Sequence, residues 1–152
     1  MRPTQHIIIS TGVGVLVSLW LKSWAAGVAC LIGGVLIDLD HVVDYVIAKK
    51  EITFDYKKFV DYCDNDTTGR IYLILHSWEA LIIMWLFIPL EPIFIGALVG
   101  ITVHLMCDQF SNPLAPLCYF ISYRSKHGFE RSKLFCQKYY AKISKNPVSP
   151  TD

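Results

Sequence analysis

The sequence predicts an all-α protein, a four-helix up-down-up-down membrane bundle followed by a short amphipathic and basic C-terminal tail. Of its 152 residues, 53% are hydrophobic and only 18% are charged, whereas soluble domains carry about 25% charged residues. Four long apolar segments are separated by short turns and by one polar loop. A net charge of +1 argues against a nucleic-acid-binding surface. The alternative to a membrane protein is a soluble bundle of four buried helices.

The first two helices are predicted over residues 6–20 and 24–47, and the tight link between them favours an antiparallel hairpin. Glycines occur within both segments, as is typical of membrane helices, in which glycine lets two backbones approach closely. The polar, charge-mixed stretch 49–70 predicts a loop. The third and fourth helices are predicted over 71–88 and 93–110, before the stop Ser111-Asn112-Pro113.

The bundle is predicted to cover residues 1–121 and the basic tail residues 122–152. The tail carries seven Lys and Arg residues against Glu130 and Asp152, so the positive-inside rule places it in the cytoplasm. Four spans then put the N-terminus and the loop 49–70 on the same side. The sequence thus predicts a multi-pass protein of the cell membrane with both termini in the cytoplasm. A tail helix that is solvated, or that lies on the lipid surface, is the alternative.

Histidines and aspartates recur at one end of the predicted bundle, where the start of helix one, the end of helix two, helix three and the end of helix four adjoin. The residues are His6, Asp38, Asp40, His41, His76, His104 and Asp108. Uncompensated carboxylates at this depth are costly, and imidazole with carboxylate suits Zn²⁺ or Mn²⁺. Because one tetrahedral ion needs only four ligands, the set indicates two or more ions. A purely structural polar network is the alternative.

These residues carry a resemblance to a known family. An early His6, Asp38-Leu39-Asp40-His41, His76-Ser77, and His104 four residues before Asp108 resemble the motifs of the inner-membrane-associated metal-dependent hydrolases, the YdjM-like, LexA-binding family. The resemblance covers residues 6–120. The family is distantly similar to zinc-dependent phospholipase C and P1-type nucleases, which implies an inner-membrane zinc hydrolase acting on phosphodiesters. Where the family has a further histidine before helix three, this chain has Gly69-Arg70.

A catalytic interpretation follows from these side chains. Water activated by the metal would attack a phosphodiester or lipid substrate, with Asp40 or Glu79 as general base. Arg70 would stabilise the developing negative charge, or else serve only as a cytoplasmic flank anchor. The predicted partner is the lipid bilayer, and nothing in the sequence points to nucleic acid. The alternative function is a non-enzymatic membrane protein whose metal site is structural, sensing or transporting.

Overall fold

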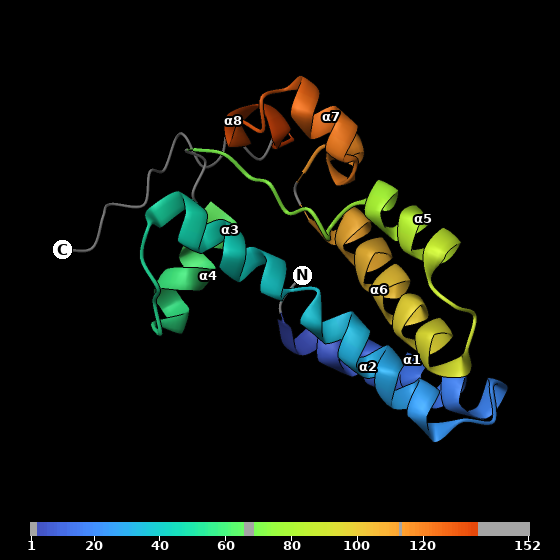
Figure 1. Ribbon diagram of the computed structural model, residues 1–152. Coiled ribbons are helices and arrows are strands. Elements are labelled where there is room, and N and C mark those ends of the chain that lie inside the picture. The colour runs from blue at the N-terminus through green and yellow to red at the C-terminus, as the bar shows by residue number, and fades with distance from the viewer. Residues whose placement is uncertain (1–2, 66–68, 113, 137–152) are drawn as a thin grey trace. The chain divides into compact units, whose positions relative to one another are not determined.

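A computed structural model describes residues 3–65, 69–112 and 114–136 of the chain (Figure 1). Regular secondary structure within these ranges is helical, which confirms the predicted all-α class. The chain forms two compact units. The first runs up to Asp40 and resumes from Ile74 to Asn112, and the second comprises His41–Leu73 and the residues that follow Asn112. The division predicted at residue 121 stays a prediction.

Four helices make up most of the first unit. They are α1 (Pro3–Trp20), α2 (Trp24–Leu36), α5 (Trp78–Phe87) and α6 (Pro92–Ser111), and the first two residues of α3 (Leu39–Lys49) belong to this unit as well. Ser23 ends the link between α1 and α2 and caps α2, because its side chain accepts a hydrogen bond from the Ala26 N–H. Helix α2 packs against both α1 and α6, and α5 packs against α6.

Small residues bring the backbones of α2 and α6 into contact. A Cβ atom added to Gly100 would overlap the carbonyl oxygen of Cys30, and one added to Gly96 would overlap that of Ala26. Such close approach is typical of helix pairs in membranes, where small residues at the interface allow van der Waals packing. The glycines of α6 therefore determine how closely its backbone approaches that of α2.

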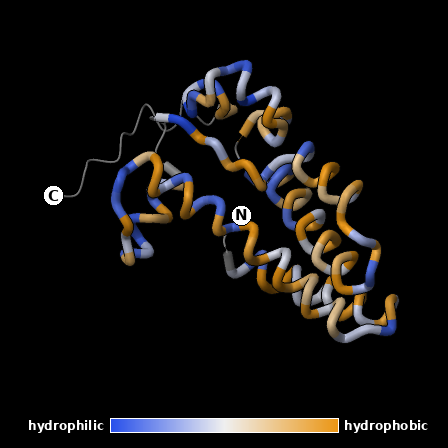
Figure 2. Tube along the Cα trace, in the orientation of Figure 1, coloured by the Kyte–Doolittle hydropathy of each residue, from blue (hydrophilic) through white to orange (hydrophobic). Residues whose placement is uncertain are grey.

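The helices of the first unit are rich in hydrophobic residues, which are orange along the trace of α1, α2, α5 and α6 (Figure 2). Two stretches are long and apolar enough to cross a membrane, Trp24–Lys49 and Pro92–Ser111, and 33% of the residues in the most apolar part of each are buried. Many large apolar side chains are more than half exposed, among them Ile8, Leu16, Leu19, Trp20, Trp24, Leu86, Phe87 and Phe110. A helix of 20 residues is about 30 Å long, the thickness of a bilayer's hydrocarbon core.

The second predicted helix, 24–47, is interrupted, which corrects the prediction of one continuous helix. Helix α2 ends at Leu36 and α3 starts at Leu39. At the break the Asp38 N–H donates to the carbonyl of Val35, at 3.2 Å, a tighter turn than the α-helical bond four residues back. The break places an acidic side chain between the two helices.

The third predicted helix, 71–88, begins only at Trp78. Ser77 adopts an extended backbone and caps the helix by accepting a hydrogen bond from the Ala80 N–H at 3.1 Å. A serine at this position satisfies one of the amide groups that have no partner within the helix. The prediction of helix before Ser77 is therefore wrong.

Side-chain carboxylates replace the missing helical hydrogen bonds of this segment. In the second unit Asp44 accepts from the Tyr72 N–H at 2.8 Å. In the first unit Asp40 accepts from the Leu75 N–H at 2.7 Å and from the His76 N–H at 3.2 Å. Because these charge-assisted bonds satisfy the backbone amides, the segment stays irregular despite its apolar sequence.

The second unit contains the rest of α3, α4 (Tyr56–Asn65), a 3₁₀ helix (Pro116–Tyr119), α7 (Ile121–Lys126) and α8 (Arg131–Leu134). The segment predicted as a polar loop thus contains α4. The carboxylate of Asp55 starts this helix by accepting from the N–H groups of Lys57 and Lys58, at 2.9 and 3.2 Å.

Two arginines of the predicted tail are buried within the second unit. Arg131 lies 3.4 Å from the carboxylate of Asp44, and Arg124 donates to the carbonyls of Tyr72 and Leu73 at 2.6 and 2.9 Å. The beginning of the tail is thus packed against α3 and the segment that ends at Leu73. Its remainder, residues 137–152, lies outside the described residues.

The thiol of Cys118 provides a test of this packing. Burial raises its pKa to about 11, and its sulfur donates to the carbonyl of Leu134 at 3.0 Å. At pH 8 only about 0.1% of such a thiol is ionised. We expect iodoacetamide to modify Cys118 at least about 100-fold more slowly than the exposed Cys136, measured by mass spectrometry. Equal rates would contradict a packed second unit.

Candidate metal centre

Five histidine and aspartate side chains of the first unit converge. They are His6 on α1, Asp38 between α2 and α3, His76 just before the N-cap of α5, and His104 and Asp108 one turn apart on α6. The ligand atoms of His6, His104 and Asp108 all lie within 4.8 Å of one another. All five side chains are at most 3% exposed except that of Asp38, which is 30% exposed. The centre is thus buried and opens towards Asp38.

Two imidazole nitrogens and two carboxylate oxygens form a closed ring of contacts. His104 Nε2 lies 3.4 Å from Asp38 Oδ1 and 3.4 Å from Asp108 Oδ2. His76 Nε2 lies 3.7 and 3.9 Å from the same two oxygens. Each nitrogen of the ring thus has the two carboxylate oxygens as neighbours, so nitrogen and oxygen donors alternate around a common centre.

These separations fit a single bound cation. Two donors that are each about 2.1 Å from a tetrahedral zinc ion lie about 3.4 Å apart. Nε2 of His104 is fully buried, and within the described part of the chain it has no hydrogen-bond partner despite both carboxylates. A buried polar atom without a hydrogen bond is costly, and a cation at the centre of the ring would satisfy it. The four side chains therefore have the spacing and the chemistry of ligands to a metal ion.

The other nitrogen of His104 fixes the orientation of its ring. Nδ1 lies 2.7 Å from the carbonyl oxygen of Gly34, which can only accept, so Nδ1 carries the proton and Nε2 presents its lone pair to the ring. The Gly34 carbonyl is available because the Asp38 N–H bonds to Val35 instead of continuing the helix. Such outer hydrogen bonds hold metal-binding histidines in one tautomer. The helix break and the ligand geometry are thus connected.

Asp40 lies on the far side of the His76 ring from the shared contacts. Its Oδ2 is 3.4 Å from His76 Nδ1, and the same oxygen accepts from the two backbone N–H groups of Leu75 and His76. Asp40 therefore orients His76 from behind, in the arrangement of a carboxylate that supports a metal-bound histidine. Its predicted role as a direct ligand or base stays a prediction.

This placement predicts how Asp40 variants behave. Asp40→Ala should weaken metal binding by about 10–100-fold, the usual cost of losing an outer partner of a ligand. Asp40→Asn should weaken it less, since the amide oxygen still accepts from both backbone N–H groups. Competition with a chromophoric chelator measures the affinities. An unchanged affinity in Asp40→Ala would contradict the positioning role.

His6 approaches the opposite edge of the Asp108 carboxylate. Its Nε2 lies 3.1 Å from Asp108 Oδ1, and its ring stacks on that of His104 with centroids 3.8 Å apart. The two oxygens of Asp108 therefore face different histidines. His6 was predicted from its place at the start of the first helix, and the structure brings it to the group.

The other predicted residues differ in where they lie. His41, the first residue of the second unit, is half-buried in α3, and its ligand atom lies within 4.8 Å of those of Asp38 and His76, so these three side chains form a second group that could hold a metal ion. Glu79 is half-buried in the first turn of α5 and is outside the group of five converging side chains. Arg70 is exposed in the second unit, where it pairs with Glu130 in an isolated β-bridge.

The group is chemically suited to bind a cation. It contains two carboxylates, Asp38 and Asp108. The histidines beside them bind a metal in their neutral form, so the charge of the ligand group is negative, and a buried negative charge favours a bound cation. The described His and Asp side chains can therefore hold a metal ion. Comparisons of the chain with protein-family models, with curated proteins and with solved structures find no match.

Proposed function

We propose that the protein is a membrane-embedded, metal-dependent hydrolase that cleaves a phosphodiester or lipid headgroup. The observation that carries the proposal is the buried ring of His76, His104, Asp38 and Asp108 contacts, at 3.4–3.9 Å. A zinc or manganese ion bound there supplies Lewis-acid polarisation and makes water acidic enough to act as a nucleophile at neutral pH. This is the chemistry that a centre of neutral imidazoles and carboxylates serves best.

Different residues of the chain have different roles in this proposal. His76, His104 and Asp108 are buried and would hold the cation, while the partly exposed Asp38 would face the side from which a substrate can approach. We keep Asp40 and Glu79 as candidate general bases. The role expected of Arg70 in stabilising developing negative charge stays a prediction, because Arg70 belongs to the second unit.

A second ion is part of the proposal. Asp108 presents one oxygen to His104 and the other to His6, so His6 and Asp108 would be the residues that hold a second cation. Paired metals stabilise both the attacking and the leaving oxygen in phosphoryl chemistry. The expected content is therefore one to two ions per chain.

The membrane part of the proposal rests on the surface of the first unit. Two stretches are long enough to span, and most of their surface is not buried. Trp20 and Trp24, both well exposed, lie beside the turn at the end of α1 opposite His6, where tryptophan anchors a helix at the lipid–water interface. We propose a multi-pass protein of the inner membrane, with both termini and the metal centre on the cytoplasmic side.

A second candidate is a metal centre without catalysis, for structure, sensing or transport. Structural zinc sites have four protein ligands, whereas catalytic sites keep one position open. The ring of four side chains favours this candidate. The 30% exposure of Asp38 favours the hydrolase, because an exposed ligand can give way to substrate.

The test uses protein purified in detergent. Elemental analysis should find at least one zinc or manganese ion per chain, and bis(4-nitrophenyl) phosphate or a phospholipid should be hydrolysed. Asp38→Asn should lower both, whereas Asp61→Asn, which changes an exposed acid on α4, should lower neither. Metal without hydrolysis supports the second candidate. A folded protein with much less than one ion per chain contradicts both.

A further inference from the structure

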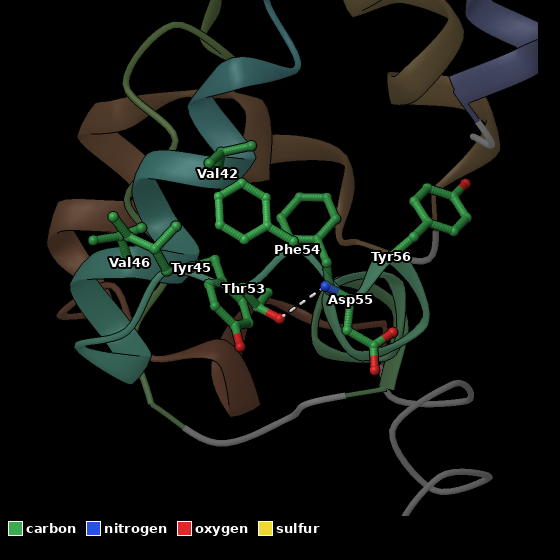
Figure 3. A pocket seen from close by; sticks show the side chains of 9 residues that line it. Val42, Tyr45, Val46, Thr53, Phe54, Asp55 and Tyr56 are labelled. Carbon is green, nitrogen blue, oxygen red and sulfur yellow. Dashed lines mark hydrogen bonds between the residues drawn. The ribbon is translucent and has the colours of Figure 1, made fainter.

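The second unit has an exposed apolar loop between α3 and α4, which we call the 49–58 segment. Ile52, Phe54 and Tyr56 are 73%, 99% and 65% exposed, and Phe54 is the most exposed large apolar side chain among the described residues. Residues 52–55 have no helical structure. Neighbouring Val42 and Val46 line an open depression of about 200 Å³ beside these side chains (Figure 3). The apolar surface therefore continues from the loop onto α3.

The polar side chains of the segment are engaged within it, whereas its apolar side chains are exposed. Thr53 accepts from the Asp55 N–H at 3.1 Å, as drawn in Figure 3, and Asp55 caps α4. Glu51 lies 2.6 Å from the Lys58 ammonium and accepts from the Tyr45 hydroxyl at 2.6 Å. The ion pair with Lys58 lowers the pKa of Glu51, so the pair persists in mild acid. These contacts join α3, the loop and α4, and present the apolar side chains in one arrangement.

Lysines flank the apolar side chains on both sides. Lys49 and Lys50 precede them and Lys57 and Lys58 follow them, and all four are exposed. Against these four positive charges the segment has only Glu51 and Asp55. Aromatic and aliphatic side chains with flanking lysines are typical of segments that lie at the surface of an anionic membrane.

The chain itself brings this segment to a membrane surface. The candidate span Trp24–Lys49 ends where the segment starts, so a chain that leaves a bilayer along this stretch reaches the segment directly afterwards. We propose that the 49–58 segment inserts Phe54 and its apolar neighbours into an anionic lipid surface, held there by the flanking lysines. This proposal goes beyond the proposed hydrolase function, and it rests on the proposed membrane location of the protein. A rigid loop loses little conformational entropy on insertion.

The test places an environment-sensitive fluorophore at Phe54→Cys in the full chain. Cys63, Cys107 and Cys136 are replaced by serine, and the buried Cys30 and Cys118 are kept. The matched control carries the fluorophore at Ser132→Cys, an exposed polar position on α8. Both proteins are reconstituted into phosphatidylcholine vesicles with or without phosphatidylglycerol.

We expect the fluorophore at position 54 to be blue-shifted, protected from iodide and quenched by spin-labelled lipid, most strongly with phosphatidylglycerol. Reversing the charges in Lys50→Glu/Lys57→Glu should remove the dependence on phosphatidylglycerol. The Ser132→Cys control should stay accessible to iodide. Iodide quenching at position 54 in a protein that resists carbonate extraction overturns this inference but leaves the membrane location intact.

Two further outcomes are decisive. Protection and self-quenching in detergent without lipid would show that a second copy covers the segment, which overturns the inference. If carbonate releases the chain, the spans are wrong. The inference then stands if the released chain sediments with phosphatidylglycerol vesicles and Phe54→Ser abolishes this binding, and it fails otherwise.

Discussion

Replacing His104 by alanine is expected to leave the purified protein without bound metal. His104 contributes the nitrogen that faces both carboxylates at 3.4 Å, so its loss removes one of four donors and leaves only the more distant His76 nitrogen, at 3.7 and 3.9 Å, between Asp38 and Asp108. Loss of an outer partner alone costs about 10–100-fold in metal affinity, and loss of a direct donor should cost at least as much. Elemental analysis and chelator competition measure the effect.

The control for this variant is His127→Ala. His127 is the half-buried histidine at the end of α7 in the second unit, where its Nδ1 contacts the Tyr123 carbonyl at 2.8 Å. Its removal should leave the metal content unchanged. Because His104→Ala also creates a cavity, Asp38→Asn tests the same ring with almost no change in volume. Full metal content in a folded His104→Ala protein would contradict the centre.

Gly100→Ala is expected to destabilise the first unit, although alanine favours helices more than glycine does. The added Cβ would overlap the Cys30 carbonyl. This carbonyl belongs to the backbone of α2, so it cannot rotate away as a side chain could. Overpacking a core typically costs about 1–3 kcal/mol, and we expect about 2 kcal/mol or more here because the helices must separate. Thermal unfolding in detergent, followed by circular dichroism, measures the change.

Gly12→Ala is the matched control on α1. A Cβ at Gly12 would meet no atom within 4 Å, so only the helix propensity changes. The substitution should stabilise the protein by up to about 1 kcal/mol. If the two alanine variants unfolded at the same temperature, close contact between α2 and α6 would not determine stability.

The sequence predicted the long helices best where one uninterrupted apolar segment forms the whole helix. The helix predicted over 93–110 is α6 (Pro92–Ser111), and the one predicted over 6–20 is α1 (Pro3–Trp20). Both are continuous apolar segments with a clear start and stop. Their ends depend on neighbouring residues, as at the proline that begins α6.

The irregular segment before α5 was not predicted, because the groups that satisfy it are distant in sequence. Asp44 and Asp40 accept from backbone N–H groups 28 and 35 residues away, and no periodicity in 71–77 indicates this. One local signal was available. Ser77 followed by Glu79 is a typical helix start, as is Asp55 before α4.

More of the candidate site than of the surrounding helix bounds could be predicted from the sequence. His6, Asp38, His76, His104 and Asp108 converge, although His76 precedes its helix instead of lying within it. These residues come together because each of them lies towards the end of a helix or directly beside one. The Gly34 carbonyl that orients His104 could not be found from sequence, since every residue has a carbonyl and only the break at Asp38 makes this one available.

Gly34 also lies in the contact between α2 and α6, because a Cβ added there would lie 3.2 Å from the Gly100 carbonyl. The same residue thus touches the helix interface and accepts the proton of a metal-binding histidine. Sliding α6 along α2 by one residue, about 1.5 Å, would break that hydrogen bond and free the ring to rotate. Metal affinity should therefore report on the register of two helices, and a chelator titration becomes a sensitive assay of how this pair assembles in a bilayer.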